Sequence, residues 1–165
     1  LDALHPVVVS SGEIEGGKAS NVRADRVTLL GTVRCLSADL HERLPAWIEE
    51  TVQAICGSFG ASARVRYRCI APPVRNDPAL TALLERSAVE QLGADQVQRL
   101  EQPSLGAEDF AELLQDVPGS MFRLGVAGPD GCAALHNGHF NPEEGALGVG
   151  VQVLTAAMLA WTPTP

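Results

Sequence analysis

One proline-rich joint, "APPVRNDP" at residues 71–78, limits how this 165-residue chain can fold. Prolines remove backbone N–H donors and fix φ, so a run of this kind interrupts helices and strands alike. Inside the joint, Asp77 and Pro78 form a helix-start signal, with an acceptor side chain at the N-cap and proline at the first helical position. The joint therefore predicts two domains, residues 1–72 and residues 73–165.

The first domain carries three strand patterns and one helix pattern. Apolar residues recur at spacings of three and four across residues 37–60, which predicts a helix that Ser37 caps and that Pro45 bends or delays. Alternating or β-branched segments predict strands at residues 5–17, 25–36 and 61–70, the first two antiparallel. The order strand, strand, helix, strand matches the last four elements of a β-α-β-β-α-β ferredoxin-like sandwich.

The second domain alternates helix and strand patterns. Helices are predicted at residues 79–93, 107–117 and 143–161, and strands at residues 95–101 and 120–128. Such alternation is typical of an α/β layer. The predicted class is therefore α/β, with a partial β-β-α-β domain followed by part of an α/β domain.

Charge, hydropathy and cysteine usage narrow the class of protein. Twenty acidic against 12 basic side chains give a net charge of -8, which repels a phosphate backbone, so no nucleic-acid partner is expected. No run of about 18 apolar residues exists to cross a bilayer, so no membrane partner is expected either. The four cysteines form no C-x-x-C pair, which favours reduced, buried thiols and a cytoplasmic location.

His136 and His139 lie three positions apart in the turn-rich stretch "AALHNGHF". Histidines in loops are either surface residues or members of a site that rigid elements build. Catalytic zinc needs at least three protein ligands, and distant His5 and His41 stand at no ligand spacing such as H-E-x-x-H. Both interpretations of the loop histidines stay open from residue types alone, and the chain by itself does not complete a metal site.

Two further groups of polar residues are candidates for ligand binding. In "PSLGAEDFAELL", Glu108 and Asp109 either complement a helix dipole or face a ligand, and Gly106 permits a close backbone approach. Arg34 ends a predicted strand, where a guanidinium can bind a carboxylate through two hydrogen bonds, and Asn21 could hold an oxygen nearby. A turn asparagine and a surface arginine are the alternative.

Three stretches together resemble the metal-dependent amidohydrolases and peptidases that carry an inserted dimerisation domain. They are "GGKASNVRADRVTLLGTVR", "SLGAEDFAELLQDVPGSMFRLG" and "LHNGHFNPEEGAL", in the same order as in that family. The similar group holds indole-acetyl-amino-acid hydrolases, hippurate hydrolases and N-acyl-amino-acid deacylases. Ala24 departs from the proline of the group's N-V-I-P-D motif, and Asn137-Gly138 departs from its Ser-Pro.

The resemblance implies roles for individual residues. His136 matches the family's last metal ligand, whereas His139 falls at a variable position. Asn21 and Arg34 match residues that contact the substrate, the arginine through its carboxylate, in a site completed across or beside a dimer interface. Gly106, Glu108 and Asp109 belong to an active-site segment without a defined role. The general base and the other metal ligands of the family would lie upstream of this chain.

The resemblance also implies a fold and a function. The chain would be a partial dimerisation domain followed by the C-terminal part of a zinc-peptidase-like catalytic domain. The intact enzyme would hydrolyse the amide bond of N-acyl amino acids with two divalent ions, zinc or manganese, as a homodimer through residues 1–72. This chain alone would be inactive. The alternatives are an oligomerisation module and an amino-acid-binding module without catalysis.

Overall fold

A computed structural model of the chain describes residues 6–162, so His5 lies outside the described residues. The chain forms two compact units. The first comprises Leu1–Val74 with Gln102–Glu112, and the second Arg75–Glu101 with Leu113–Pro165. A short segment of the sequence-defined second domain thus belongs to the first unit, and the division at residue 72 stays a prediction.

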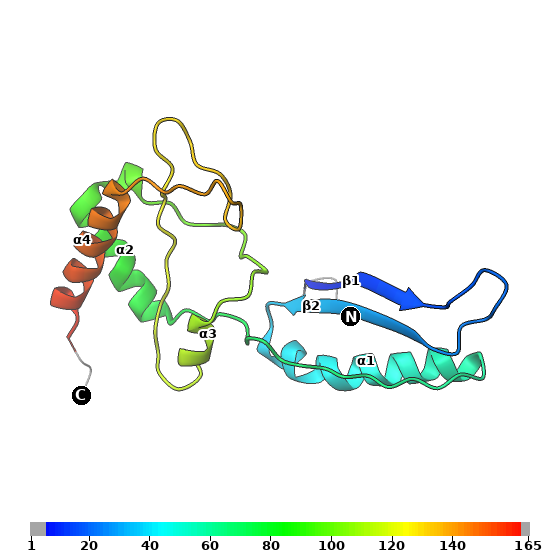
Figure 1. The fold of residues 1–165 in the computed structure, drawn as a ribbon. Helices are drawn as coiled ribbons and strands as arrows, with labels where there is room; N and C mark the ends of the chain where they lie inside the picture. The colour runs from blue at the N-terminus through cyan, green and yellow to red at the C-terminus, as the bar shows by residue number, and fades with distance from the viewer. Residues whose placement is uncertain (1–5, 163–165) are drawn as a thin grey trace. The chain divides into compact units, whose positions relative to one another are not determined.

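The first unit contains an antiparallel hairpin of β1 (Val7–Gly16) and β2 (Val27–Cys35), as predicted (Figure 1). A bulge between Ser11 and Glu13 shifts the register of the ladder. Opposite the bulge, a Cβ atom on Gly31 would collide with the backbone oxygen of Ser10, so glycine is required for this close approach.

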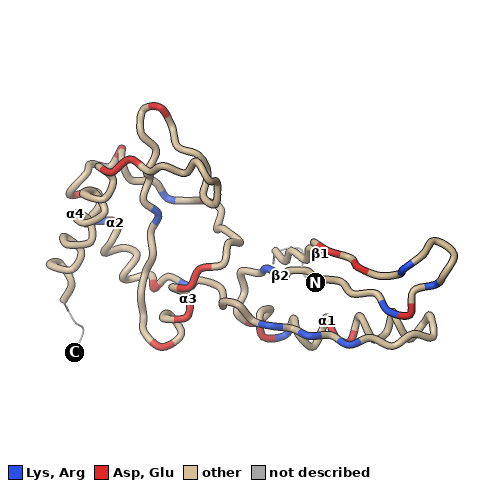
Figure 2. Tube along the Cα trace, in the orientation of Figure 1, with Lys and Arg blue, Asp and Glu red and all other residues tan. Residues whose placement is uncertain are grey.

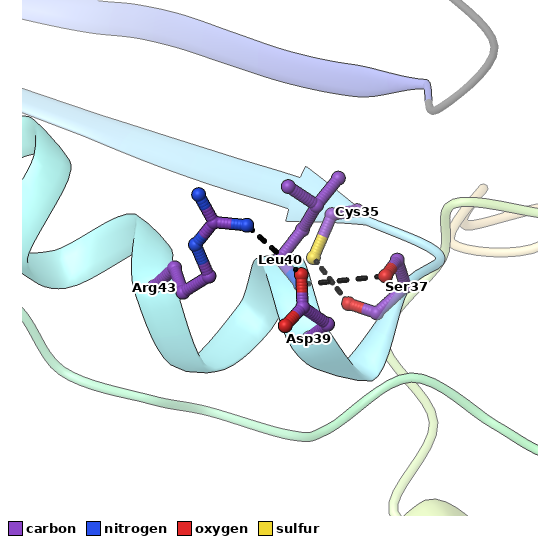
Figure 3. Close-up of polar contacts among 5 residues, drawn as sticks. All are labelled: Cys35, Ser37, Asp39, Leu40 and Arg43. Atoms are coloured by element: carbon purple, nitrogen blue, oxygen red, sulfur yellow. Dashed lines mark hydrogen bonds and ion pairs between the residues drawn. The ribbon is translucent and has the colours of Figure 1, made fainter. Parts of the chain in front are cut away.

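Helix α1 (Ala38–Ser58) follows the hairpin directly. The Ser37 hydroxyl accepts a hydrogen bond from the Leu40 amide at 3.3 Å, so the predicted N-cap is confirmed (Figure 3). Pro45 lies inside the helix and does not delay its start. A proline removes one backbone hydrogen bond, and the other turns of this 21-residue helix remain. Leu40 and Leu44 are buried and form the core of this unit together with Ala111.

Residues 61–70 run back along α1 as an extended segment. Gln53 donates to the Ala63 carbonyl at 2.8 Å, and His41 Nε2 lies 3.1 Å from Cys69 Sγ. Apolar side chains are half-buried at alternate positions, and the intervening basic positions, blue in Figure 2, are exposed. The predicted strand is nevertheless wrong, because a strand needs a hydrogen-bonded neighbour and the sheet of the described residues joins β1 to β2 alone.

In the second unit, α2 (Pro78–Leu92) packs beside α4 (Gly145–Ala160), as Figure 1 shows. The Asp77 carboxylate accepts from the Leu80 amide at 2.9 Å and Pro78 is the first helical residue, so this predicted start is confirmed. Small residues let the helices approach closely. The buried positions are Ser87, Gly150, Val153 and Ala157. No helix within residues 6–162 is long and apolar enough to cross a membrane.

The two strands predicted in the second unit are wrong. Residues 94–96 form a short 3-10 helix, η1 (Ala94–Gln96), and residues 97–101 and 120–127 join no ladder. Within the second of these segments, the amide and carbonyl of Met121 are both satisfied by the side-chain amide of Asn76, at 3.0 and 2.8 Å. A side chain thus takes the place of a neighbouring strand.

Candidate functional site

Arg34 is held against the segment that contains the predicted active-site residues. It is exposed on β2, one residue before the strand ends, and its Nη1 donates to the Leu105 carbonyl at 2.8 Å. This contact joins residues 71 positions apart within the first unit. The Leu105 carbonyl was not among the residues expected from the sequence, and no spacing signals it. One of the five N–H donors of the guanidinium is used, and the others can bind an anion.

The segment beyond Leu105 turns sharply before a helix begins. The Gly106 amide donates to the Ser104 hydroxyl at 3.0 Å. Glu108 is half-buried, and its carboxylate accepts a hydrogen bond from the Phe110 amide at 3.4 Å, whereas Asp109 is exposed. Helix α3 (Phe110–Leu113) is only four residues long, so the predicted helix over residues 107–117 is too long. Both acids precede α3 rather than lying in its first turn. Their backbone carbonyls accept hydrogen bonds from the Ala111 and Glu112 amides at the start of the helix.

Asn21 lies away from Arg34. It is exposed in the turn between the two strands, where the Val22 amide donates to the Ala19 carbonyl at 3.2 Å. That turn joins the opposite end of β2 from Arg34, and seven strand residues at about 3.3 Å each separate Val27 from Arg34 by about 23 Å. A small molecule does not span this distance, so one copy of the chain does not bring the two residues to the same ligand.

His136 belongs to the second unit and has an unusual backbone. Among residues 6–162 it is the only non-glycine residue with positive φ, at 66°. It is exposed in a tight turn, which a hydrogen bond from the Asn137 amide to the Ala134 carbonyl closes at 3.2 Å. A side chain in the left-handed region costs about 1–2 kcal/mol, and such strain is concentrated at functional sites. The turn therefore fixes this imidazole in an exposed position at an energetic cost.

The loop of residues 127–142, called here the His136 loop, is tied at its base and along its length. The Glu143 amide donates to the Val126 carbonyl at 2.9 Å, and the Cys132 thiol to the Asn141 carbonyl at 3.3 Å. Asn137 accepts the His139 amide at 2.9 Å through its side chain. The departure from the family's Ser-Pro at residues 137 and 138 thus still gives an ordered turn.

The described residues do not form a complete metal site. His136 supplies an exposed imidazole, a common ligand of zinc and similar ions. Within residues 6–162, no three His, Cys, Asp or Glu side chains are grouped so as to hold an ion. His41 is engaged with Cys69. His136 is therefore a candidate for a single metal ligand, and no reaction step through a metal follows from these residues alone.

Comparison with curated proteins gives the chain its relatives. The model of Peptidase family M20/M25/M40 matches residues 2–160. A probable hydrolase of Synechocystis sp. is 45% identical over 96% of this chain and 40% of its own length. An N-acetyldiaminopimelate deacetylase of Priestia megaterium is 32% identical over 94% of this chain and 40% of its own length. The chain therefore spans about two fifths of the length of these relatives.

Solved structures show the same relationship at the level of the fold. The YxeP protein of Bacillus subtilis, a dinuclear metal binding peptidase from the M20 family, superposes with a TM-score of 0.78 and 27% identity. The match covers 93% of this chain and 42% of that one. The mixed α/β class is thereby confirmed, and so is the resemblance to metal-dependent amidohydrolases and peptidases. Matched over nearly its whole length, this chain belongs to Peptidase family M20/M25/M40.

Proposed function

We propose that the intact protein is a metal-dependent amidohydrolase that cleaves the amide bond of N-acyl amino acids, and that this chain is its C-terminal portion. The relatives include proteins named as a deacetylase and as a probable hydrolase, of which the chain spans about 40%. A cytoplasmic location is part of the proposal, supported by four free cysteines.

The backbone of His136 is the observation that carries this proposal. A positive φ is uncommon for residues other than glycine, and such backbone conformations cluster at functional sites, so φ 66° at His136 supports a functional role for this residue. The resemblance of the sequence motifs also implies that this residue corresponds to the family's last metal ligand. We propose that His136 binds one of two divalent ions, zinc or manganese, and that His139 does not.

Arg34 would hold the free carboxylate of the amino-acid leaving group. Its contact with the Leu105 carbonyl uses one donor of the guanidinium and holds Arg34 beside the segment that contains Gly106, Glu108 and Asp109. Bound divalent ions would activate water and polarise the scissile carbonyl. Hydrolysis then adds water across the C–N bond and releases a carboxylic acid and an amino acid, with the general base supplied from outside this chain.

A homodimer would reconcile the positions of Asn21 and Arg34. About 23 Å of strand separates them within one copy, so both contact one substrate only if two copies contribute. We propose that Asn21 of one protomer completes the site of its partner, with dimerisation through residues 1–72.

The test compares this chain with the longer polypeptide that includes the upstream coding region. With zinc or manganese and N-acetyl amino acids, the longer polypeptide should release free amino acid, and the 165-residue chain should not. Turnover by the short chain alone contradicts the proposed division of the site.

The non-catalytic alternatives predict different results. Calorimetric binding of a free amino acid by the longer polypeptide, without any metal and without hydrolysis of an acyl derivative, would support a binding module instead. Self-association without metal binding or hydrolysis would support an oligomerisation module.

A further inference from the structure

Cys69 and His41 form a thiol–imidazole pair outside the proposed hydrolytic site. The ring nitrogen Nε2 of His41 lies 3.1 Å from the Cys69 sulfur, and the residues come from α1 and from the extended segment 61–70. Cys69 is exposed, whereas Tyr67, two positions earlier, is half-buried. The sulfur therefore lies at the accessible end of the segment, beside a side chain that can accept its proton.

The other three cysteines differ from Cys69 in exposure and in partner. All three are half-buried. The Cys35 thiol donates to the Ser37 carbonyl at 3.6 Å, as Figure 3 shows, and burial raises the pKa of this thiol. The Cys132 thiol donates to the Asn141 carbonyl at 3.3 Å. A carbonyl oxygen accepts a hydrogen bond from a thiol but does not take its proton, so neither pair favours the thiolate.

We propose that Cys69 is a site of thiol–disulfide exchange, modified by low-molecular-weight disulfides, with His41 as the proton acceptor. The proton of the thiol passes to Nε2 of His41, and the thiolate attacks one sulfur of the small disulfide. A new S–S bond forms at Cys69 while the S–S bond of the reagent breaks. The leaving sulfur departs as a thiolate, and the incoming disulfide is the oxidant that balances the step.

The experiment uses the 165-residue chain and 5,5′-dithiobis(2-nitrobenzoate) as the small disulfide, with absorbance recorded at neutral pH. One thiol should react about 10-fold or more faster than the other three. With less than one equivalent of reagent, peptide mass mapping should find the adduct on Cys69. In denaturant all four thiols should react at one rate, which shows that the difference depends on the fold.

Two variants assign the roles. Cys69→Ser should abolish the fast phase, and His41→Gln should slow it about 10-fold or more while leaving the slow phases unchanged. Circular dichroism verifies that each variant is folded. The peptide mapping uses the unsubstituted chain, so it tests the proposal even if a variant does not fold. An adduct on another cysteine, four equal rates in the folded chain, or an unchanged fast phase in folded His41→Gln would overturn the proposal.

Discussion

Arg34 and His136 are both proposed to contact the reacting molecules, yet the chain holds them in opposite ways. Arg34 lies on a strand whose ladder pairs it with Val8, and its backbone is unstrained. His136 lies in a turn with φ at 66°, held by hydrogen bonds within its own loop. The comparison shows that a strand can position a side chain without backbone strain. In this loop, by contrast, the left-handed backbone of His136 lowers the free energy of unfolding. Substitution of either residue should therefore lower activity, but only substitution of His136 by glycine should also raise the free energy of unfolding.

The largest effect is expected from His136→Ala in the longer polypeptide. Removing a metal ligand should lower metal content and reduce hydrolysis by at least about 100-fold, since loss of an outer-shell partner alone costs 10–100-fold. Metal analysis and initial rates provide the measurements. His139→Ala is the matched control, three positions away in the same loop, and should keep both properties. Equal losses in the two variants would remove the distinction between the histidines.

Arg34→Ala should have the next largest effect. Loss of a charged hydrogen-bonding partner for the substrate carboxylate costs about 1.5–3 kcal/mol, which is roughly a 10-fold to 100-fold increase in KM. Steady-state kinetics on N-acyl amino acids and on their carboxamides measures it, and the carboxamides should show little change. Arg66→Ala is the control, an exposed arginine on the extended segment 61–70. A KM unaffected by Arg34→Ala would exclude the carboxylate contact.

Gly31→Ala tests how firmly the ladder holds the strand that positions Arg34. The added Cβ would meet the backbone oxygen of Ser10, so the free energy of unfolding should fall by about 1–3 kcal/mol. Gly12→Ala in the opposite strand is the control, because a Cβ there meets nothing within 4 Å. Urea denaturation of the 165-residue chain compares the two. Equal stabilities would show that the bulge relaxes easily.

His136→Gly should have the opposite sign. Glycine removes the penalty of about 1–2 kcal/mol for a left-handed residue that carries a side chain. Its greater conformational freedom in the unfolded state lowers the free energy of unfolding by about 0.4–1 kcal/mol. The free energy of unfolding should therefore rise by up to about 1.6 kcal/mol, while His139→Gly should lower it. Both are read from urea denaturation. A loss of stability in His136→Gly would mean that the turn does not store strain.

The smallest effect concerns the ion pair between Arg99 and Glu85 in the second unit. Hydrogen bonds from Arg99 to Glu85, at 2.7 Å, lower the pKa of this carboxyl below its ordinary value. A lowered folded-state pKa stabilises the fold above the unfolded value, near 4.5, and this stability is lost as the pH falls through the folded value. Glu85→Gln should therefore be slightly less stable at pH 7 and equal to the parent in strong acid. High salt should reduce the difference.

Local signals made the starts of α1 and α2 predictable. Ser37 and Asp77 cap α1 and α2 because an N-cap depends on residues within one turn. The alternation over residues 61–70 correctly predicted exposed arginines between half-buried apolar residues, but Cys69, expected on the covered face, is exposed. Whether that segment joins a sheet depends on a neighbouring backbone, which no local pattern contains.

The site was predictable only in part, for the same reason. Arg34 could be singled out, but its Leu105 partner lies 71 residues away and is a carbonyl that every residue possesses. The pairing of Asn76 with Met121 spans 45 residues and replaced a predicted strand. His136 was singled out through the resemblance, and no neighbouring residue predicted its left-handed backbone. The roles of these residues stay predictions.

The closed base of the His136 loop has a consequence for how this part of the chain can vary. Because the Glu143 amide and the Val126 carbonyl meet, the two arms keep their spacing whatever the length of chain between them. Extra residues at the outer turn near Pro129 and Asp130 would be accommodated without displacing α4. An insertion at this turn should therefore lengthen the protrusion while its point of attachment stays constant.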